Sequence, residues 1–296
     1  MSVLRMHADE RETDEALVRR LLEAQHPEWA SLPIERVPSS GTDNALYRLG
    51  DDMVVRLPRI HWAVAGLERE LEWLPQLAPH LPVEIPTPLA TGSPDDEYPW
   101  PWAVYGWLDG ENPRVRQVDD SGSFAPELAE FLRALQRVVL AGPPTRRGKP
   151  LRTQNDQARA ALAELNGEID VAAATSAWEK ALRAPDWRGP SVWLHGDLLP
   201  GNLLVRGGQL TGVLDFALVG MGDPACDLIA TWSVLSARER AVFREELEVD
   251  DEMWARGSGW ALSIALIALP YYRETNPGFA GIARHLINEV LTDSPV

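Results

Sequence analysis

Three polar side chains lie at spacings that suit one kind of chemistry. The segment from His195 to Asn202 reads HGDLLPGN, so Asp197 precedes Asn202 by five residues, and Asp215 follows Asp197 by eighteen residues. Transfer of a phosphoryl group from a nucleoside triphosphate to a hydroxyl needs one carboxylate that accepts the hydroxyl proton. It also needs an amide oxygen and a second carboxylate that hold Mg²⁺ on the phosphates. The spacing therefore predicts Asp197 as the catalytic base and Asn202 and Asp215 as magnesium ligands.

A predicted β-hairpin explains how Asn202 and Asp215 can lie close together. Two apolar runs, 202–205 and 210–214, are separated by Gly207-Gly208, which is typical of a tight turn between strands. A hairpin would bring Asn202 and Asp215, at its two open ends, back together. Asp, Asn and Gly also occur in ordinary turns. It is the joint spacing, and no single residue, that indicates a catalytic loop.

The segment from Trp193 to Asp227 resembles the aminoglycoside phosphotransferase family, a branch of the protein-kinase-like fold. The matching runs are HGDLLPGNLLV, GVLDF and GMGDPACDL. Protein kinases have the same aspartate-to-asparagine spacing in H-R-D-x-x-x-x-N, but Gly196 stands here where they have arginine.

The resemblance also implies structural roles for the neighbouring polar residues. A histidine can act as a base, but the resemblance assigns that role to Asp197 and implies that His195 holds the loop by packing and hydrogen bonding. It implies that Asp227 caps backbone amides of the catalytic loop. Asp223 remains open, because an aspartate before a proline is also a good helix N-cap.

Length and composition fit a globular protein without a membrane anchor. The 296 residues suffice for one large or two medium domains, and 45% are hydrophobic and 24% charged. The single cysteine, Cys226, allows no intramolecular disulfide, residues 1–12 lack the apolar core of a secretory signal, and the best apolar stretch, 260–269, is too short to span a bilayer. The net charge of −16 argues against nucleic acid and is compatible with a cationic substrate. We therefore expect a cytoplasmic protein with no nucleic-acid or membrane partner.

The remaining pattern predicts an α+β fold of the bilobal, protein-kinase-like type. Helices are expected over 13–25 and 63–77, and strands over 34–37, 45–49, 53–57 and 102–105, whereas the chain from Phe124 onward is mostly helical. This order predicts a small β-rich N-lobe over 1–104 that binds the nucleotide phosphates, a hinge over 105–110, and a larger, mainly helical C-lobe over 111–296. The C-lobe would contain the catalytic loop and the acceptor site.

The N-lobe must supply groups that bind the phosphates. The segment 39–44 reads SSGTDN between two expected strands and resembles the phosphate-facing loop of the family, which makes Ser40, Gly41, Thr42 and Asn44 candidate nucleotide ligands. The same letters also fit an ordinary turn.

A cation and its anchor are expected next to this loop. Strand 54–57 reads VVRL where kinases usually have V-A-I-K, so Arg56 takes the place of the usual lysine. Arginine keeps the charge and can bind phosphate through two N–H groups, although a surface arginine would have the same sequence. Glu68, Glu70 and Glu72 on the following helix could pair with it, and Glu70 is chosen because it lies beside the apolar stripe.

The nucleotide base should rest between the lobes. Tyr105-Gly106-Trp107 resembles the hinge, whose main chain would bond the base, so Tyr105 and Trp107 are candidate nucleotide contacts. Trp107 could instead belong to the core. The sequence does not choose between ATP and GTP.

The leading interpretation is a small-molecule kinase, a phosphotransferase with an alcohol group as acceptor. It would use Mg²⁺ and transfer the γ-phosphate of ATP or GTP to a hydroxyl. The resemblance implies an aminoglycoside or a related antibiotic, and hence antibiotic resistance. The net charge favours a neutral to cationic acceptor. An acidic run over 245–252 is usually a solvated helix end and turn, but it could also attract an amine-bearing substrate. Possible lining residues of the acceptor site are Trp232, Trp260, Tyr271, Tyr272 and Glu274. The aromatic residues among them could instead belong to the core.

Two alternatives remain. The acceptor could be a metabolite alcohol, such as a sugar or a choline-like or homoserine-like compound. The protein could also be a nucleotide-binding pseudoenzyme that acts as a regulatory module, since Arg56 departs from the usual lysine.

Overall fold

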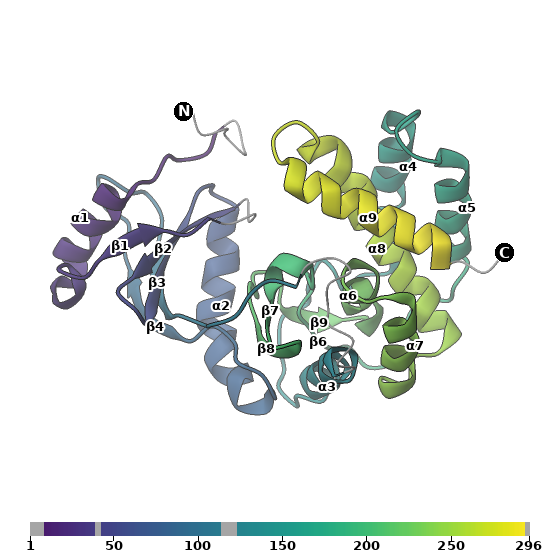
Figure 1. The fold of residues 1–296 in the computed structure, drawn as a ribbon, viewed down its shortest axis with the longest axis horizontal. Coiled ribbons are helices and arrows are strands. Elements are labelled where there is room, and N and C mark those ends of the chain that lie inside the picture. Colours follow the sequence, from purple (N-terminus) through teal and green to yellow (C-terminus); the bar gives the residue numbers. More distant parts are fainter. Residues whose placement is uncertain (1–8, 39–42, 114–122, 294–296) are drawn as a thin grey trace.

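The structure is a computed structural model, and it describes residues 9–38, 43–113 and 123–293. A β-sheet with two helices forms the N-terminal region, and helices form most of the C-terminal region (Figure 1). The fold is therefore α+β and of the kinase-like class, as the sequence predicted. Within the described ranges, no helix is long and apolar enough to cross a membrane.

The N-terminal sheet has five strands in the order β1-β2-β3-β5-β4, and every neighbouring pair is antiparallel. Its strands are β1 (Ile34–Arg36), β2 (Asn44–Leu49), β3 (Met53–Pro58), β4 (Pro88–Gly92) and β5 (Trp102–Gly106). Strand β4 was not predicted individually, because two prolines suggested a break there. It begins at Pro88 on the edge of the sheet, where the missing N–H of a proline is tolerated.

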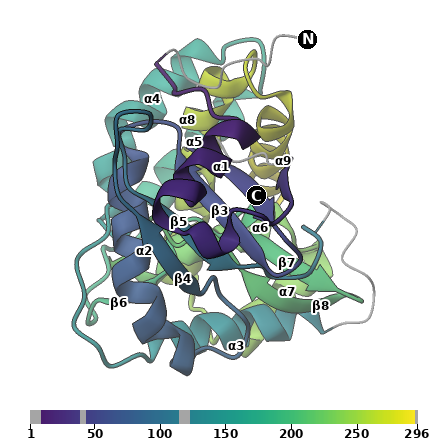
Figure 2. The same ribbon diagram turned by 90° about the vertical axis from the view of Figure 1, so that its left-hand side faces the viewer.

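The two faces of the sheet are covered by different partners. Helix α1 (Glu15–Gln25) packs on one face, which Figure 2 shows in front of the sheet, and Asp14 caps its first turn by accepting a hydrogen bond from Leu17 N. Helix α2 (Ala63–Leu77) covers the other face and lies between the sheet and the C-terminal region (Figure 1). Side chains alternate between the faces of a strand. Val55 therefore packs towards α1, whereas its neighbour Arg56 faces α2.

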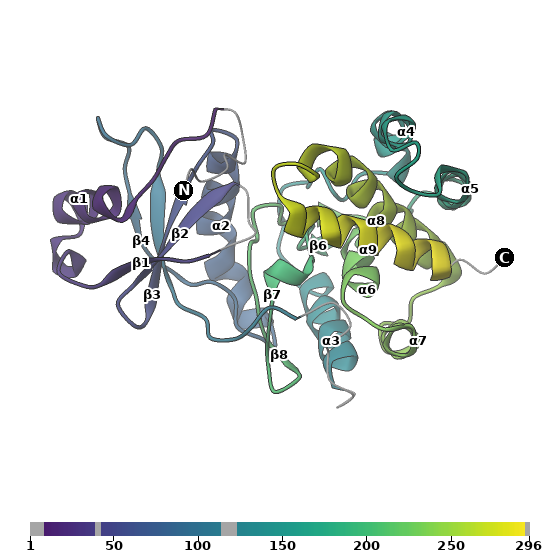
Figure 3. The ribbon, with the colours of Figure 1, turned by 45° about the horizontal axis from the view of Figure 1, so that its top comes forward.

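Seven helices form the C-terminal region within the described ranges. They are α3 (Phe124–Gln136), α4 (Asn155–Glu164), α5 (Val171–Leu182), α6 (Ile229–Ser233), α7 (Ala237–Glu246), α8 (Asp251–Tyr272) and α9 (Pro277–Asp293). Short 3₁₀ turns cover Pro27–Trp29, Ala78–His80, Leu151–Gln154, Pro200–Asn202 and Pro224–Leu228. Helix α8 packs against α5 and α9, and α4 and α5 lie at the outer edge of this region, away from the sheet (Figures 1 and 3).

Two short strand pairs are set into the helical region. Strand β6 (Val192–Leu194) pairs with β9 (Gly220–Gly222), and β7 (Leu203–Arg206) pairs with β8 (Gln209–Val213) as the expected hairpin. Gly207 and Gly208 form its turn with φ of +58° and +80°, which suits a two-residue hairpin turn with positive φ at both central positions.

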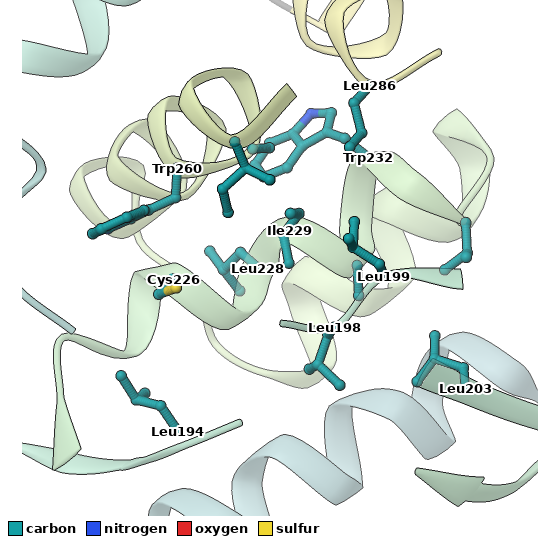
Figure 4. Close-up of a cluster of buried hydrophobic side chains, with 14 of the residues drawn as sticks. Leu194, Leu198, Leu199, Leu203, Cys226, Leu228, Ile229, Trp232, Trp260 and Leu286 are labelled. Carbon is teal, nitrogen blue, oxygen red and sulfur yellow. The ribbon is translucent and has the colours of Figure 1, made fainter. Parts of the chain in front are cut away.

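The core of the C-terminal region supports the loop that follows β6. Figure 4 shows Leu198 and Leu199 among buried side chains of the surrounding elements. Trp232 and Trp260 are fully buried in the same cluster. These two tryptophans therefore belong to the core, which excludes them as lining residues of an open acceptor site.

Candidate active site

Asp227 fixes the start of the loop that carries Asp197. Its two carboxylate oxygens accept hydrogen bonds from the backbone N–H groups of His195 (2.8 Å) and Gly196 (2.7 Å), and the side chain is buried. This is the capping role that the family resemblance implied. Asp223 has a different role, because it caps the 3₁₀ turn at Pro224 by accepting from Ala225 N and forms an ion pair with Arg256 at 2.8 Å.

His195 connects the loop to the residue before Asp215. Its Nε2 lies 2.9 Å from the carbonyl oxygen of Leu214, and its Nδ1 lies 3.1 Å from the backbone N–H of Asp197. Burial lowers the pKa of His195, so the ring is neutral. A neutral ring that donates from Nε2 and accepts at Nδ1 satisfies both contacts. Because both nitrogens are engaged, His195 is a structural residue of the loop.

The backbone conformation at Gly196 accounts for the departure from the kinase pattern. Its φ is +86°, in the region that side-chain-bearing residues rarely adopt. A Cβ at this position would also lie 3.0 Å from the carbonyl oxygen of Leu218. An arginine does not fit this backbone without a rearrangement.

Asp197 and Asn202 are held against each other. Asn202 Nδ2 donates to the backbone oxygen of Asp197 at 2.8 Å and to its Oδ2 at 3.2 Å. Burial raises the pKa of Asp197 to about 6, against the opposing effect of Arg147. The carboxylate is therefore mostly ionised at neutral pH and is able to accept a proton.

The hairpin brings Asp215 to the same place. The backbone N–H of Leu214 donates to the carbonyl oxygen of Asn202 at 2.8 Å, which joins the two open ends of β7 and β8. Asp215 itself has a φ of +59°, and it is one of two residues other than glycine with positive φ in the described ranges. Such strained positions cluster at functional sites.

The oxygens of Asn202 and Asp215 fit a magnesium ion bound to a nucleotide. Asn202 uses Nδ2 for its contacts with Asp197, and among the described residues its Oδ1 has no hydrogen-bond partner. Mg²⁺ prefers oxygen ligands and is commonly held by one or two protein groups together with phosphates and water. No group of three or more His, Cys, Asp or Glu side chains suited to a metal occurs within the described ranges. A two-residue oxygen set is what a site completed by phosphate oxygens requires.

Arg56 is the centre of a buried polar cluster. Its Nη1 donates to Glu70 Oε2 at 2.6 Å and its Nη2 to Asp215 Oδ1 at 3.1 Å. In the amide orientation that satisfies its neighbours, Asn44 Oδ1 accepts from Arg56 Nη2 at 2.9 Å. Burial opposes the charge of Arg56, but Glu70 and Asp215 outweigh it and raise its pKa above the ordinary value. The structure therefore pairs Arg56 with Glu70, the partner chosen from the sequence.

The expected hinge residues make contacts mainly within the N-terminal region. Tyr105 is buried and its hydroxyl donates to Glu70 Oε2 at 3.1 Å. The backbone N–H of Trp107 donates to the carbonyl oxygen of Asp52 at 2.7 Å, and its indole ring stacks under Arg48, whose Cζ lies 4.3 Å from the ring centre. Any contact of the Trp107 backbone with a nucleotide base would therefore use its carbonyl oxygen. Ser40, Gly41 and Thr42 lie outside the described residues.

Three arginines near the site were not singled out from the sequence. Arg147 Nη2 lies 4.0 Å from Asp197 Oδ1, Arg146 is its neighbour, and Arg69 on α2 donates to the carbonyl oxygen of Val219 at 3.1 Å. The run Arg146-Arg147-Gly148-Lys149 is a dense positive segment in a chain of net charge −16. This positive segment in an acidic chain is the sequence feature that could have identified the arginines as site candidates.

Of the two interpretations of the acidic run over 245–252, the structure supports the helix end and turn. Asp250 caps α8 by accepting from Met253 N, and Asp251 pairs with Arg244. Helix α7, which leads into this run, lies on the side of the helical region away from the N-terminal sheet (Figures 1 and 3). The run therefore forms the end of α7, the turn after it and the start of α8.

A family model described as phosphotransferase enzyme family matches residues 34–260, which is more than half of the chain. A curated relative, the uncharacterized protein YcbJ of Bacillus subtilis (strain 168), is 24% identical over 216 residues, which cover 68% of each chain.

Solved structures share the fold. The GDP and kanamycin complex of APH(2")-IIia is 19% identical and superimposes with a TM-score of 0.76 over 95% of this chain and 100% of that chain. Macrolide 2'-phosphotransferase type I is also 19% identical, with a TM-score of 0.64 over 94% of this chain and 98% of that one. Likeness at this identity shows the fold alone, because one fold can support different functions.

Proposed function

Because this chain belongs to the phosphotransferase enzyme family, we propose that it is a magnesium-dependent kinase that transfers the γ-phosphoryl group of ATP or GTP to a hydroxyl of a small molecule. The observation that carries the proposal is the meeting of Asp197, Asn202 and Asp215 at one hairpin end, with Arg56 bonded to Asp215 from the sheet. A base, an oxygen pair for a metal and a buried cation are the groups that phosphoryl transfer needs.

The N-terminal residues take part through the phosphates. Arg56 binds them, and Glu70 and Asn44 hold its guanidinium in place. Ser40, Gly41 and Thr42, which lie outside the described residues, are proposed nucleotide contacts on the family resemblance, and the segment from Tyr105 to Trp107 faces the base as the hinge of the two lobes. Nucleotide complexes among the structural neighbours, such as those with GDP and ADP, support a nucleotide co-substrate.

The chemical step requires one proton acceptor. Asp197 takes the proton of the acceptor hydroxyl as its oxygen forms the new bond to the γ-phosphorus, and the bond from that phosphorus to the β–γ bridging oxygen breaks. Asn202 holds the Asp197 side chain in position. A bound Mg²⁺ would neutralise charge on the phosphates.

Two classes of acceptor fit this step. An aminoglycoside or related antibiotic is favoured by the neighbours, one of which is a kanamycin complex and another a gentamicin complex. A role in antibiotic resistance would follow for that acceptor. A metabolite alcohol is favoured by the arginines beside Asp197, which do not suit a polycationic antibiotic.

A screen tests the proposal directly. The purified protein is incubated with Mg²⁺ and ATP or GTP and a panel of aminoglycosides, macrolides and small alcohols with and without acidic groups, and products are followed by ³¹P NMR. A new phosphate ester with release of nucleoside diphosphate is expected. Tight nucleotide binding without any transfer over the whole panel would favour the regulatory alternative.

A further inference from the structure

The segment 143–148 holds two arginines beside the candidate base. It runs along residues 218–223, which follow the Asp215 motif, through three backbone hydrogen bonds: Met221 N to Pro143 O (2.8 Å), Thr145 N to Met221 O (3.1 Å) and Asp223 N to Gly148 O (3.1 Å). The hydroxyl of Thr145 also donates to the carbonyl oxygen of Leu218 at 2.7 Å. Arg146 and Arg147 are therefore presented by a backbone that is fixed on both sides.

Arg147 lies beside the backbone of the catalytic loop at Gly196. A Cβ on Gly196 would lie 3.5 Å from the Cβ of Arg147, so the arginine packs against the backbone of the catalytic loop. From there its Nη2 lies 4.0 Å from Asp197 Oδ1, at the limit of an ion pair. The guanidinium thus lies next to the proposed base without a close hydrogen bond to it.

The positive charge of this segment is poorly satisfied within the protein. Arg147 Nε is buried and has no hydrogen-bond partner among the described residues. Arg146 is exposed and forms no ion pair with any described residue. Arg69 adds a third guanidinium to the same surroundings. Buried donors are almost always paired, so an unpaired guanidinium N–H here indicates a missing acceptor.

Resting on the proposed kinase function, we propose that Arg146 and Arg147 form an anion site and that the acceptor carries a carboxylate or phosphate group near the hydroxyl that is phosphorylated. A guanidinium binds either group through two parallel hydrogen bonds. Arg147 would thereby hold the hydroxyl against Asp197. The acceptor class is then a hydroxy acid or a phosphorylated alcohol.

The overall charge of −16 does not oppose this assignment. Surface charges are screened beyond about 10 Å at 0.1 M ionic strength. Beside Asp197, an acceptor meets the positive charges of Arg146 and Arg147 together with the carboxylate of Asp215. In the acidic run over 245–252, Asp250 caps α8 and Asp251 pairs with Arg244.

A titration with inorganic phosphate tests the site without knowledge of the acceptor. The full-length protein is first saturated with Mg²⁺ and a non-hydrolysable ATP or GTP analogue, so that the γ-phosphate position is filled. Phosphate is then added at constant ionic strength and its binding measured by calorimetry. We expect binding in the wild type and at least about tenfold weaker binding in Arg147→Gln and Arg146→Gln, because each removes a charged hydrogen-bond donor. Arg146 is exposed, so its variant is expected to fold even if Arg147→Gln does not.

Arg159→Gln is the matched control, since Arg159 is an exposed arginine on α4 that pairs with Glu179 on α5. It should bind phosphate like the wild type. Three results would overturn the proposal: no phosphate binding while the analogue is bound, equal phosphate affinity in all four proteins, or a loss confined to affinity for the analogue. A loss of affinity for the analogue alone would mean that the two arginines bind the γ-phosphate of the nucleotide and not the acceptor. A wild type that fails to bind the nucleotide analogue would instead refute the kinase function.

Discussion

Nη2 of Arg56 lies 3.1 Å from Oδ1 of Asp215, although the two residues are 159 positions apart in the chain. The contact joins strand β3 of the N-terminal sheet to the open end of the β7–β8 hairpin. It places a buried cation directly against the carboxylate proposed to bind the metal. Arg56 also holds Glu70, which is fully buried, so one guanidinium pairs with two carboxylates from different regions.

Replacement of Arg56 should therefore affect both stability and nucleotide binding. In Arg56→Met, Glu70 remains buried without its cation, and breaking such a pair costs about 3–5 kcal/mol. Urea denaturation should show this loss. Calorimetry should show much weaker binding of Mg²⁺-nucleotide, and Arg56→Lys should retain part of the affinity, because it keeps the charge but not the planar fork.

A double variant separates the two effects. Arg56→Met with Glu70→Gln removes both charges, so most of the lost stability should return while nucleotide binding stays weak. Recovery of binding together with stability would mean that Arg56 acts only through the fold.

The metal assignment makes an ordered prediction. Asp215→Asn should weaken Mg²⁺-dependent nucleotide binding more than Asn202→Ala, because a carboxylate offers a full charge to a hard cation and an amide only a dipole. Asparagine is chosen at position 215 because it tolerates the positive φ of that residue. Affinities measured with and without Mg²⁺ decide the matter, and variants that keep the metal dependence of the wild type would refute the site.

The catalytic loop should be sensitive to a single methyl group. Gly196 and Gly167 have nearly equal φ values of +86° and +88°, but only a Cβ at Gly196 meets other atoms. Gly167→Ala should cost about 1–2 kcal/mol from backbone conformation alone. Gly196→Ala should cost more, and it should also lower turnover. Equal losses of stability would show that the packing against Leu218 is unimportant.

Protonation of His195 should destabilise the fold in mild acid. Burial lowers its pKa below the ordinary 6.5, so the unfolded chain binds this proton more readily than the folded one. The stabilising contribution is complete above pH 6.5 and declines as the pH falls below that value. Urea midpoints at pH 7.5 and 5.5 should therefore differ less for His195→Gln than for the wild type. The same decline in both proteins would contradict the neutral, buried state of His195.

The parts of the candidate site that depend on local spacing could be predicted from the sequence. The hairpin and the joining of Asn202 to Asp215 followed from two apolar runs and a glycine pair, and Glu70 followed from its place beside the apolar stripe of α2. Helix α2 has the predicted bounds, 63–77, because its pattern and its burial agree. The roles of these residues towards a nucleotide remain predictions.

Features that depend on contacts between distant segments of the chain could not be predicted from the sequence. Strand β9 is three residues long and pairs with β6, and a segment so short has no periodicity to detect. Arg147 reaches Asp197 only because the segment 143–148 lies along residues 218–223, which no local pattern indicates. For the acidic run over 245–252 the sequence left two interpretations open, since its charge is evident in the sequence but its position in space is not.

The rate of phosphoryl transfer in Asp197→Asn is the most direct test of the proposed function. Asparagine keeps the size of the side chain but cannot accept the hydroxyl proton, and a positioned base contributes on the order of 10²–10⁴-fold to the rate. Single-turnover transfer to the acceptor found by the screen should fall by about that factor, while the affinity for Mg²⁺-nucleotide remains within a few-fold of the wild type. Transfer at the wild-type rate by Asp197→Asn would contradict the assignment of Asp197 as the base.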